Sequence, residues 1–202
     1  MTSDTLLLIC GPELRSEHES APPLRDDAVD RMRRTLFALG PVQKLGLFRL
    51  GLVTSDPEVQ EIAAQHGVVR IDADRAAGLP DGIEIAAAVA ERAGFRRLCI
   101  LSSPARTPSL RDLRRLLATD APVTVCPTPN HGTAALLLAP PRAIRFHDAP
   151  RSAIQHLRAA GAAGLRAAMI PLESMTGRSG TRAAPPVEPG VRPGRTASSS
   201  CA

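Results

Sequence analysis

The chain has 202 residues, 44% of them hydrophobic, which is enough for one domain with a buried core. It contains four phenylalanines but no tryptophan or tyrosine, so the core is expected to consist of Leu, Ile, Val and Ala. The formal net charge is +5, but four arginines and one glutamate after residue 176 supply +3 of it. Because no aromatic residues interleave with basic ones, the composition argues against a nucleic-acid partner.

The sequence also argues against a membrane partner. No apolar run approaches the length of a membrane-spanning helix, and no basic residues precede the first apolar run as they would in a signal peptide. A cytoplasmic location is therefore expected. Cys10, Cys99 and Cys126 fall in predicted strands and should be small buried residues without metal or redox chemistry, whereas Cys201 should be exposed.

Predicted strands and helices alternate along the chain. Short apolar runs predict strands, and apolar residues spaced three or four apart predict helices. Strands are predicted at residues 5–10, 47–53, 68–71, 97–101, 123–126, 134–139 and 166–170. Helices are predicted at residues 24–39, 57–66, 81–93, 110–118 and 151–161. This alternation is typical of an α/β fold of three layers, in which helices cover both faces of a mainly parallel sheet.

Proline and glycine mark two of the helix boundaries. Gly40 and Pro41 are expected to end the first helix, because proline cannot donate a backbone hydrogen bond. Ser55, Asp56 and Pro57 read as a helix start, with a capping side chain followed by proline in the first turn.

Residues 177–202 differ in composition from the rest of the chain. They are rich in Pro, Gly, Ser and Arg and almost free of large apolar residues. Such a segment cannot bury enough surface to offset the entropy lost on ordering. The sequence therefore predicts a folded domain over residues 1–176 and a disordered tail over residues 177–202.

Limited proteolysis should remove the chain after about residue 176 without unfolding the remainder, because the tail has no apolar surface with which to dock. Mass spectrometry of the protected fragment, together with its melting curve, checks this. Loss of the whole domain on clipping would show that the tail is part of the fold.

The most specific stretch of the chain is HGTAALLLAPPRAIRF, residues 131–146. Together with SAIQH (152–156), AAGAAGL (159–165) and VTSDPEVQEIAAQHG (53–67), it resembles the guanylyltransferases of coenzyme F-420 biosynthesis. Members of that family join GTP to phosphoenolpyruvate, 2-phospho-L-lactate or a related phosphorylated three-carbon acid. The resemblance covers about residues 5–172 and implies a single GT-A-like nucleotidyltransferase domain.

The resemblance implies a binding site for the phosphorylated acid. In the family, a Gly-Thr motif and a later Gly and Ser bind this substrate. The matching residues here are Gly132, Thr133, Ala149 in place of the family's Gly, and Ser152. The two hydroxyl groups can donate hydrogen bonds to phosphate oxygens, although ordinary loop and cap roles are the other interpretation. The Cβ of Ala149 would keep the loop farther from the ligand than glycine would.

The resemblance also implies a divalent metal, normally Mg²⁺, but its carboxylate ligands are missing. The family holds the metal with an Asp after the strand that corresponds to residues 97–101, and here Pro104 takes that position. The family's second acidic motif, after the last strand, corresponds to SMTGRSGT at residues 174–181. Ser102 and Ser103 do not replace the lost acid, because serine hydroxyls are poor Mg²⁺ ligands. No metal ligand and no catalytic residue is therefore assigned.

The nucleotide side of the site is reduced as well. The family's first loop carries Lys and Arg for the triphosphate, whereas this chain offers Arg15 among Glu13, Glu17 and Glu19. The family's sugar-and-base motif is Gly-Leu-Asn, and here it reads Gly-Leu-Pro at residues 78–80.

Two other residue patterns have spacings that occur in catalytic or metal sites. Ser152 and His156 are four residues apart and so share one side of a helix, but no nucleophile-elbow motif surrounds the serine. Asp72 and Asp74 have the spacing with which glycosyltransferases of similar fold chelate a metal, and they read equally as a polar loop after a strand.

Two functions are compatible with the sequence. One is a guanylyltransferase whose partners are GTP and a phosphorylated three-carbon acid. The other is a catalytically degenerate relative that binds a ligand or a protein partner, and the loss of the acidic residues favours it. A scaffold without a ligand ranks third, and the sequence gives no indication of the oligomeric state.

Overall fold

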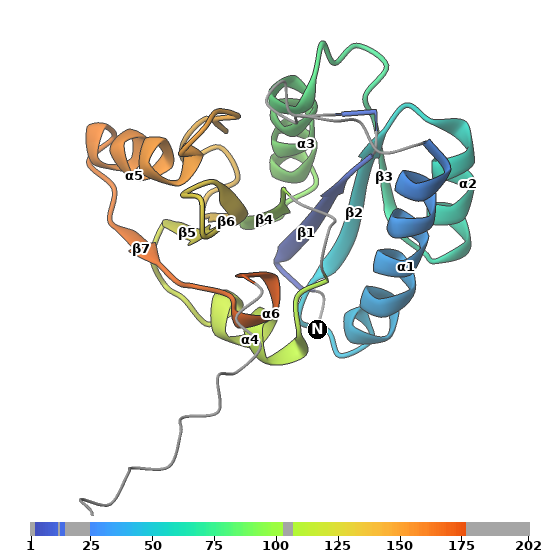
Figure 1. Cartoon of the computed structure of the whole chain (residues 1–202), viewed down its shortest axis with the longest axis horizontal. Helices are drawn as coiled ribbons and strands as arrows, with labels where there is room; N and C mark the ends of the chain where they lie inside the picture. The colour runs from blue at the N-terminus through green and yellow to red at the C-terminus, as the bar shows by residue number, and fades with distance from the viewer. Residues whose placement is uncertain (1–2, 12, 15–24, 103–106, 177–202) are drawn as a thin grey trace, which may run out of the picture.

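The computed structural model describes residues 3–11, 13–14, 25–102 and 107–176 (Figure 1). Its strands are β1 (Thr5–Cys10), β2 (Arg49–Thr54), β3 (Val69–Asp72), β4 (Arg97–Leu101), β5 (Val123–Pro127), β6 (Thr133–Leu138) and β7 (Ala167–Met169). Its helices are α1 (Arg25–Gln43), α2 (Pro57–Gln65), α3 (Leu79–Arg92), α4 (Leu110–Leu117), α5 (Ser152–Ala162) and α6 (Glu173–Thr176). Every element predicted from the sequence is present, and α6 is an addition.

The strands form one sheet in the order β3-β2-β1-β4-β6-β5-β7. All run in the same direction except β6, which is antiparallel to both of its neighbours, β4 and β5. The reversal follows from the short link between β5 and β6, because a few residues can connect antiparallel strands but not parallel ones. The predicted α/β class with a mainly parallel sheet is confirmed.

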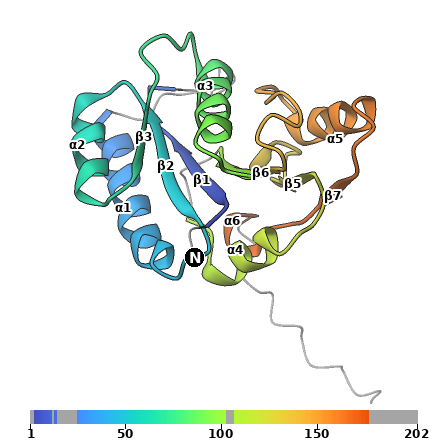
Figure 2. The ribbon, with the colours of Figure 1, turned by 180° about the vertical axis from the view of Figure 1, so that it is seen from behind.

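Helices cover both faces of the sheet (Figures 1 and 2). Helices α3 and α5 pack on one face, and α1, α2 and α4 pack on the other. Side chains of β1 alternate between the two layers, with Leu6 and Leu8 in the first and Leu7 and Ile9 in the second. Because β1 is buried on both faces, its sequence is a continuous apolar run.

The core is mainly aliphatic, as predicted, but it also includes Phe48 and Phe146. Among the phenylalanines, Phe48 is 1% exposed whereas Phe37 is 73% exposed. Cys10, Cys99 and Cys126 are buried free thiols, which confirms their predicted burial. Burial raises the pKa of Cys10 and of Cys99 to about 12, so both stay protonated and unreactive.

The cap of α2 was predicted correctly, and the end of α1 was not. The Asp56 carboxylate accepts the Glu58 N–H at 2.9 Å and the Val59 N–H at 3.3 Å. Helix α1, however, continues through Pro41 to Gln43. Proline normally disfavours helix in the preceding residue by a clash with its Cβ, and Gly40 has no Cβ. The single N–H lost at Pro41, near the helix end, does not stop the helix.

Several sequence-based predictions lie outside the described residues. These are the assignments of Arg15, Ser103, Pro104 and Cys201 and the disorder of residues 177–202. The division into a domain and a tail therefore stays a prediction. Among the described helices, none combines the length and the apolar character that crossing a bilayer requires.

Candidate functional site

The first residue of β6 lies at the edge of the sheet where the parallel strands end. Since β6 is antiparallel, its Ala135 pairs with Leu101, the last residue of β4, and Thr133 pairs with Pro127, the last residue of β5. The hydroxyl of Ser102 donates to the Thr133 carbonyl and joins the two strand ends. In open α/β sheets ligands bind beyond this carboxyl edge, so Thr133 is well placed for a site.

The loop before Thr133 is held tightly. The Thr128 N–H donates to the Gly132 carbonyl at 2.8 Å, and the His131 N–H donates to the Thr128 carbonyl at 3.0 Å. A Cβ at Gly132 would lie 3.0 Å from the Thr128 hydroxyl, a tight contact that the threonine side chain would have to relieve. His131 has a φ of 63°, a left-handed conformation that is costly for a residue with a Cβ.

A second left-handed residue begins α5. Arg151 has a φ of 63° and gives the helix no side-chain cap. The first amides of α5 instead donate to backbone carbonyls, Ser152 N–H to Ala149 at 3.0 Å and Ala153 N–H to His131 at 3.2 Å. Within the described residues, His131 and Arg151 are the two non-glycine residues with positive φ, and they flank one site. Strain gathered in this way is typical of ligand sites.

Three buried side chains form a chain of hydrogen bonds between β6 and α5. The Thr133 hydroxyl oxygen lies 2.9 Å from that of Ser152 and 3.0 Å from His156 Nδ1. On its other side the ring accepts the backbone N–H of His147 at Nε2, at 2.9 Å. The structure thus brings together two residues predicted from the sequence, Thr133 and Ser152. It adds His156, which connects them to His147 in the loop between β6 and α5.

His156 is held as a neutral ring. It is fully buried, and the rings of Phe146 and His147 lie 5.2 Å and 5.5 Å from it between centroids. Burial, with a smaller contribution from His147, lowers its pKa from 6.5 to about 4. The Ser152–His156 pair considered from the sequence makes no direct hydrogen bond, because the Thr133 hydroxyl stands between them. This geometry is that of a polar support, with no activated nucleophile.

An acidic side chain crosses the ends of β1 and β2 at the same edge. The Glu13 carboxylate accepts the Thr54 hydroxyl at 2.5 Å and the Ser55 N–H at 2.6 Å. It also lies over Gly11, where a Cβ would be 2.4 Å from a carboxylate oxygen. These two donors are therefore occupied by a carboxylate of the chain itself.

The described carboxylates do not form a site that fits Mg²⁺. Asp72 accepts the Asp74 N–H at 2.9 Å, as in a polar turn after a strand. Across the described ranges, no three acidic, histidine or cysteine side chains come close enough together to hold a metal ion. One carboxylate oxygen of Asp148 is buried and has no hydrogen-bond partner among the described residues. Those residues also place too few acidic, histidine or cysteine side chains beside it to complete a metal site.

A carboxylate that sequence reasoning missed, Asp112, serves a structural junction. It is 3% exposed and accepts the N–H of Ser174 at 3.0 Å and also the Ser174 hydroxyl. Burial raises its pKa, but the hydrogen bonds from Ser174 and Ser109 outweigh burial and lower the pKa. The sequence feature that could have pointed to Asp112 is its spacing from Ser109, which is that of a helix capping pair. In the structure the Asp112 N–H donates to the Ser109 hydroxyl at 3.1 Å.

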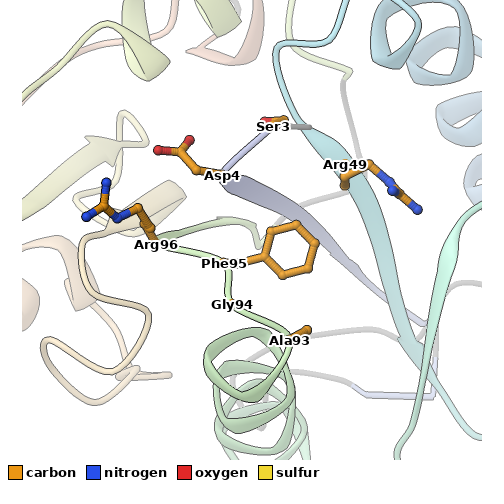
Figure 3. A pocket seen from close by; sticks show the side chains of 7 residues that line it. All are labelled: Ser3, Asp4, Arg49, Ala93, Gly94, Phe95 and Arg96. Carbon is orange, nitrogen blue, oxygen red and sulfur yellow. The ribbon is translucent and has the colours of Figure 1, made fainter. Parts of the chain in front are cut away.

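A hollow of about 340 Å³ lies at the opposite, amino edge of the sheet (Figure 3). It is formed where β1, β2 and β4 begin, and its charged lining residues are Asp4, Arg49 and Arg96. The side chains of Arg49 and Arg96 point away from each other on either side of Phe95 (Figure 3), so they do not converge on one ligand. The candidate site is consequently the carboxyl edge around Thr133.

No protein-family model and no curated protein sequence matches this chain. Solved structures do resemble it. A protein described as a nucleotide-diphospho-sugar transferase, from Desulfovibrio desulfuricans G20, is 18% identical, with a TM-score of 0.54 over 84% of this chain and 80% of that one. The chain has a GT-A-like nucleotidyltransferase fold.

Two further structures have the same fold. A 4-diphosphocytidyl-2C-methyl-D-erythritol synthase is 15% identical, with a TM-score of 0.53 over 87% of this chain and 92% of that one. A CMP:2-keto-3-deoxy-manno-octonic acid synthetase complexed with CTP is 12% identical, with a TM-score of 0.50 over 85% and 90%. At these identities the likeness establishes the nucleotidyltransferase fold, and it assigns no residue of this chain a role.

Proposed function

We propose that this chain binds a phosphorylated three-carbon acid at the carboxyl edge of its sheet, in the manner of the acid-binding half of an F-420-type guanylyltransferase. The observation that carries the proposal is the buried contact of 2.9 Å between the Thr133 and Ser152 hydroxyls at that edge. The motif match at Gly132, Thr133 and Ser152 supplies the substrate class, as the resemblance implies.

Ser152 is the residue proposed to contact the phosphate. It is buried at the first position of α5, and its own N–H is already donated to the Ala149 carbonyl. Its hydroxyl is therefore the polar group of Ser152 that is available to a ligand. Thr133 is engaged with both Ser152 and His156, so its role is to hold the serine, with the Gly132 loop beside them. Ala149 is proposed to border the ligand through its backbone.

Binding without transfer is preferred to guanylyl transfer for two reasons. Glu13 places a negative charge at the ends of β1 and β2, which opposes a triphosphate there. Nucleotidyl transfer also depends on a cation that bridges the phosphates, and the described residues offer no set of ligands for one. Transfer from GTP stays the second candidate, supported by the fold shared with nucleotide-handling proteins such as the synthetase crystallised with CTP.

Phosphoenolpyruvate should bind without metal and should depend on the two hydroxyls. A hydrogen bond to a charged group contributes about 1.5–3 kcal/mol, so Ser152→Ala is expected to weaken binding about tenfold or more. Thr133→Val should act in the same direction by releasing the serine. Titration calorimetry at constant pH measures both, and Ser55→Ala, at the end of β2, is the matched control.

Two further titrations identify the recognised group. Inorganic phosphate should compete with phosphoenolpyruvate, whereas pyruvate should compete much less, because the proposed contact is to the phosphate. Binding that neither variant affects would place the site elsewhere. No binding at millimolar phosphoenolpyruvate would refute the proposed function and leave the partner-binding and scaffold alternatives.

GTP with Mg²⁺ should stabilise the protein little. A ligand at a hundred times its dissociation constant adds about 2.7 kcal/mol to the free energy of unfolding, which a melting curve detects easily. A shift of that size that disappears with a chelator would contradict the prediction and favour guanylyl transfer. Asp72, Asp74 and Asp148 would then be the carboxylates to replace first.

A further inference from the structure

The contacts of His156 determine which of its ring nitrogens carries the proton. A neutral imidazole has one N–H and one bare nitrogen. The backbone N–H of His147 can only donate, so Nε2, which lies 2.9 Å from it, must be the bare nitrogen. The proton is consequently on Nδ1, and it donates to the Thr133 hydroxyl oxygen at 3.0 Å.

The direction of the next hydrogen bond follows. The Thr133 oxygen accepts from His156, so its own hydrogen needs an acceptor within this buried cluster. The Ser152 hydroxyl oxygen, at 2.9 Å, is the acceptor that the structure provides. All the hydrogen bonds therefore run one way, from His147 through His156 and Thr133 to Ser152. The Ser152 hydrogen at the end of the series remains available for donation.

We propose that His156 is a positioning residue that sets the Ser152 hydroxyl as a hydrogen-bond donor, so that the site selects an acceptor oxygen of an anionic ligand such as a phosphate. This inference rests on the proposed function, because it assumes that Ser152 contacts the ligand. It extends the proposal by explaining why a fully buried histidine links the β6 start to α5. His156 does not touch the ligand itself.

Histidine suits this role because it is both acceptor and donor across a rigid ring. Without a donor beside it, the Thr133 hydroxyl could point its hydrogen away from Ser152. The Ser152 hydroxyl could then donate its own hydrogen to the Thr133 oxygen. The serine would face the ligand with lone pairs, which repel a phosphate oxygen. A preset donor avoids reorganisation when the anion binds.

The tautomer is tested without any ligand. Two-dimensional ¹H–¹⁵N spectra that correlate the ring nitrogens with the carbon-bound ring protons distinguish a protonated nitrogen from a bare one. Wild-type protein at neutral pH should show His156 with Nδ1 protonated and Nε2 bare, and the resonances are assigned by their loss in His156→Asn. A spectrum with Nε2 protonated would overturn the proposal, whatever the protein binds.

Two substitutions separate positioning from packing. The amide of His156→Asn can take the place of Nδ1 and still donate to Thr133, whereas the oxygen of His156→Gln can take the place of Nε2 and accept from His147. Both variants lose the ring, so both should be destabilised. We expect phosphoenolpyruvate affinity to stay near that of wild type in the Asn variant and to fall about tenfold in the Gln variant.

The outcomes distinguish this inference from the proposed function. Equal affinities in the Asn and Gln variants, each confirmed as folded by circular dichroism, would overturn the positioning role while leaving phosphate binding intact. If wild-type protein binds no phosphoenolpyruvate, the proposed function fails, and with it the selection of an anion oxygen. The tautomer spectrum would still decide the direction of the hydrogen bonds.

Discussion

Between pH 6.5 and pH 4 the free energy of unfolding should fall by about 3 kcal/mol through His156 alone. In the folded protein its pKa is about 4, and in the unfolded chain it returns to 6.5. As the pH falls below 6.5 the unfolded state takes up a proton that the folded state does not, so unfolding becomes easier. The stabilisation is complete above pH 6.5, and its loss is complete once the folded ring is protonated too, below pH 4.

Urea denaturation at half-unit steps of pH measures this effect. His156→Asn should remove the step between pH 6.5 and pH 4, even though the variant is less stable at every pH. His66→Asn, at the end of α2 and remote from the Thr133 contacts, is the matched control and should keep the step. Parallel profiles for wild type and His156→Asn would show that another group causes the acid sensitivity.

The architecture was largely predictable because each element is encoded locally. The continuous apolar run of β1 reflects burial on both faces, and the Asp56–Pro57 start of α2 is a short-range capping pattern. The reversed direction of β6 was not predicted. It depends on which strands become neighbours in the sheet, and the pattern of apolar residues is the same for either direction.

The candidate site was predictable only in part, for the same reason. The resemblance placed Thr133 and Ser152 together, although they are 19 residues apart in the chain. It gave no role to His156, because the bond from His147 and the bond to Thr133 exist only once α5 has packed against β6. The left-handed backbone at His131 and Arg151 was equally invisible, since neither is a residue type that requires it.

The structural role of Asp112 was not predicted, because it depends on a hydrogen-bonding partner that is distant in the sequence. The carboxylate is buried at the first turn of α4, and its acceptor oxygen receives both the N–H and the hydroxyl of Ser174, 62 residues later. Leu172, fully buried, packs on the same side of the sheet just before this contact. The junction therefore fixes α6 to the start of α4, which lie side by side in Figures 1 and 2.

Asp112→Ala should destabilise the protein by about 3 kcal/mol. It removes two hydrogen bonds to a charged acceptor, and each such bond contributes about 1.5–3 kcal/mol. Part of this loss is recovered, because water can then hydrogen-bond to Ser174. Asp112→Asn keeps one acceptor oxygen and should cost about half as much. Urea denaturation gives the global loss, and hydrogen exchange at the Ser174 amide reports whether α6 is released.

Asp120→Ala is the control, because that carboxylate is 89% exposed and its ion pair with Arg166 spans 3.8 Å at the surface. If the two alanine variants were equally stable, Asp112 would not hold α6 in place. Ser174→Ala in the Asp112→Ala background should add little, because its partner is already gone, and a fully additive loss would contradict the contact.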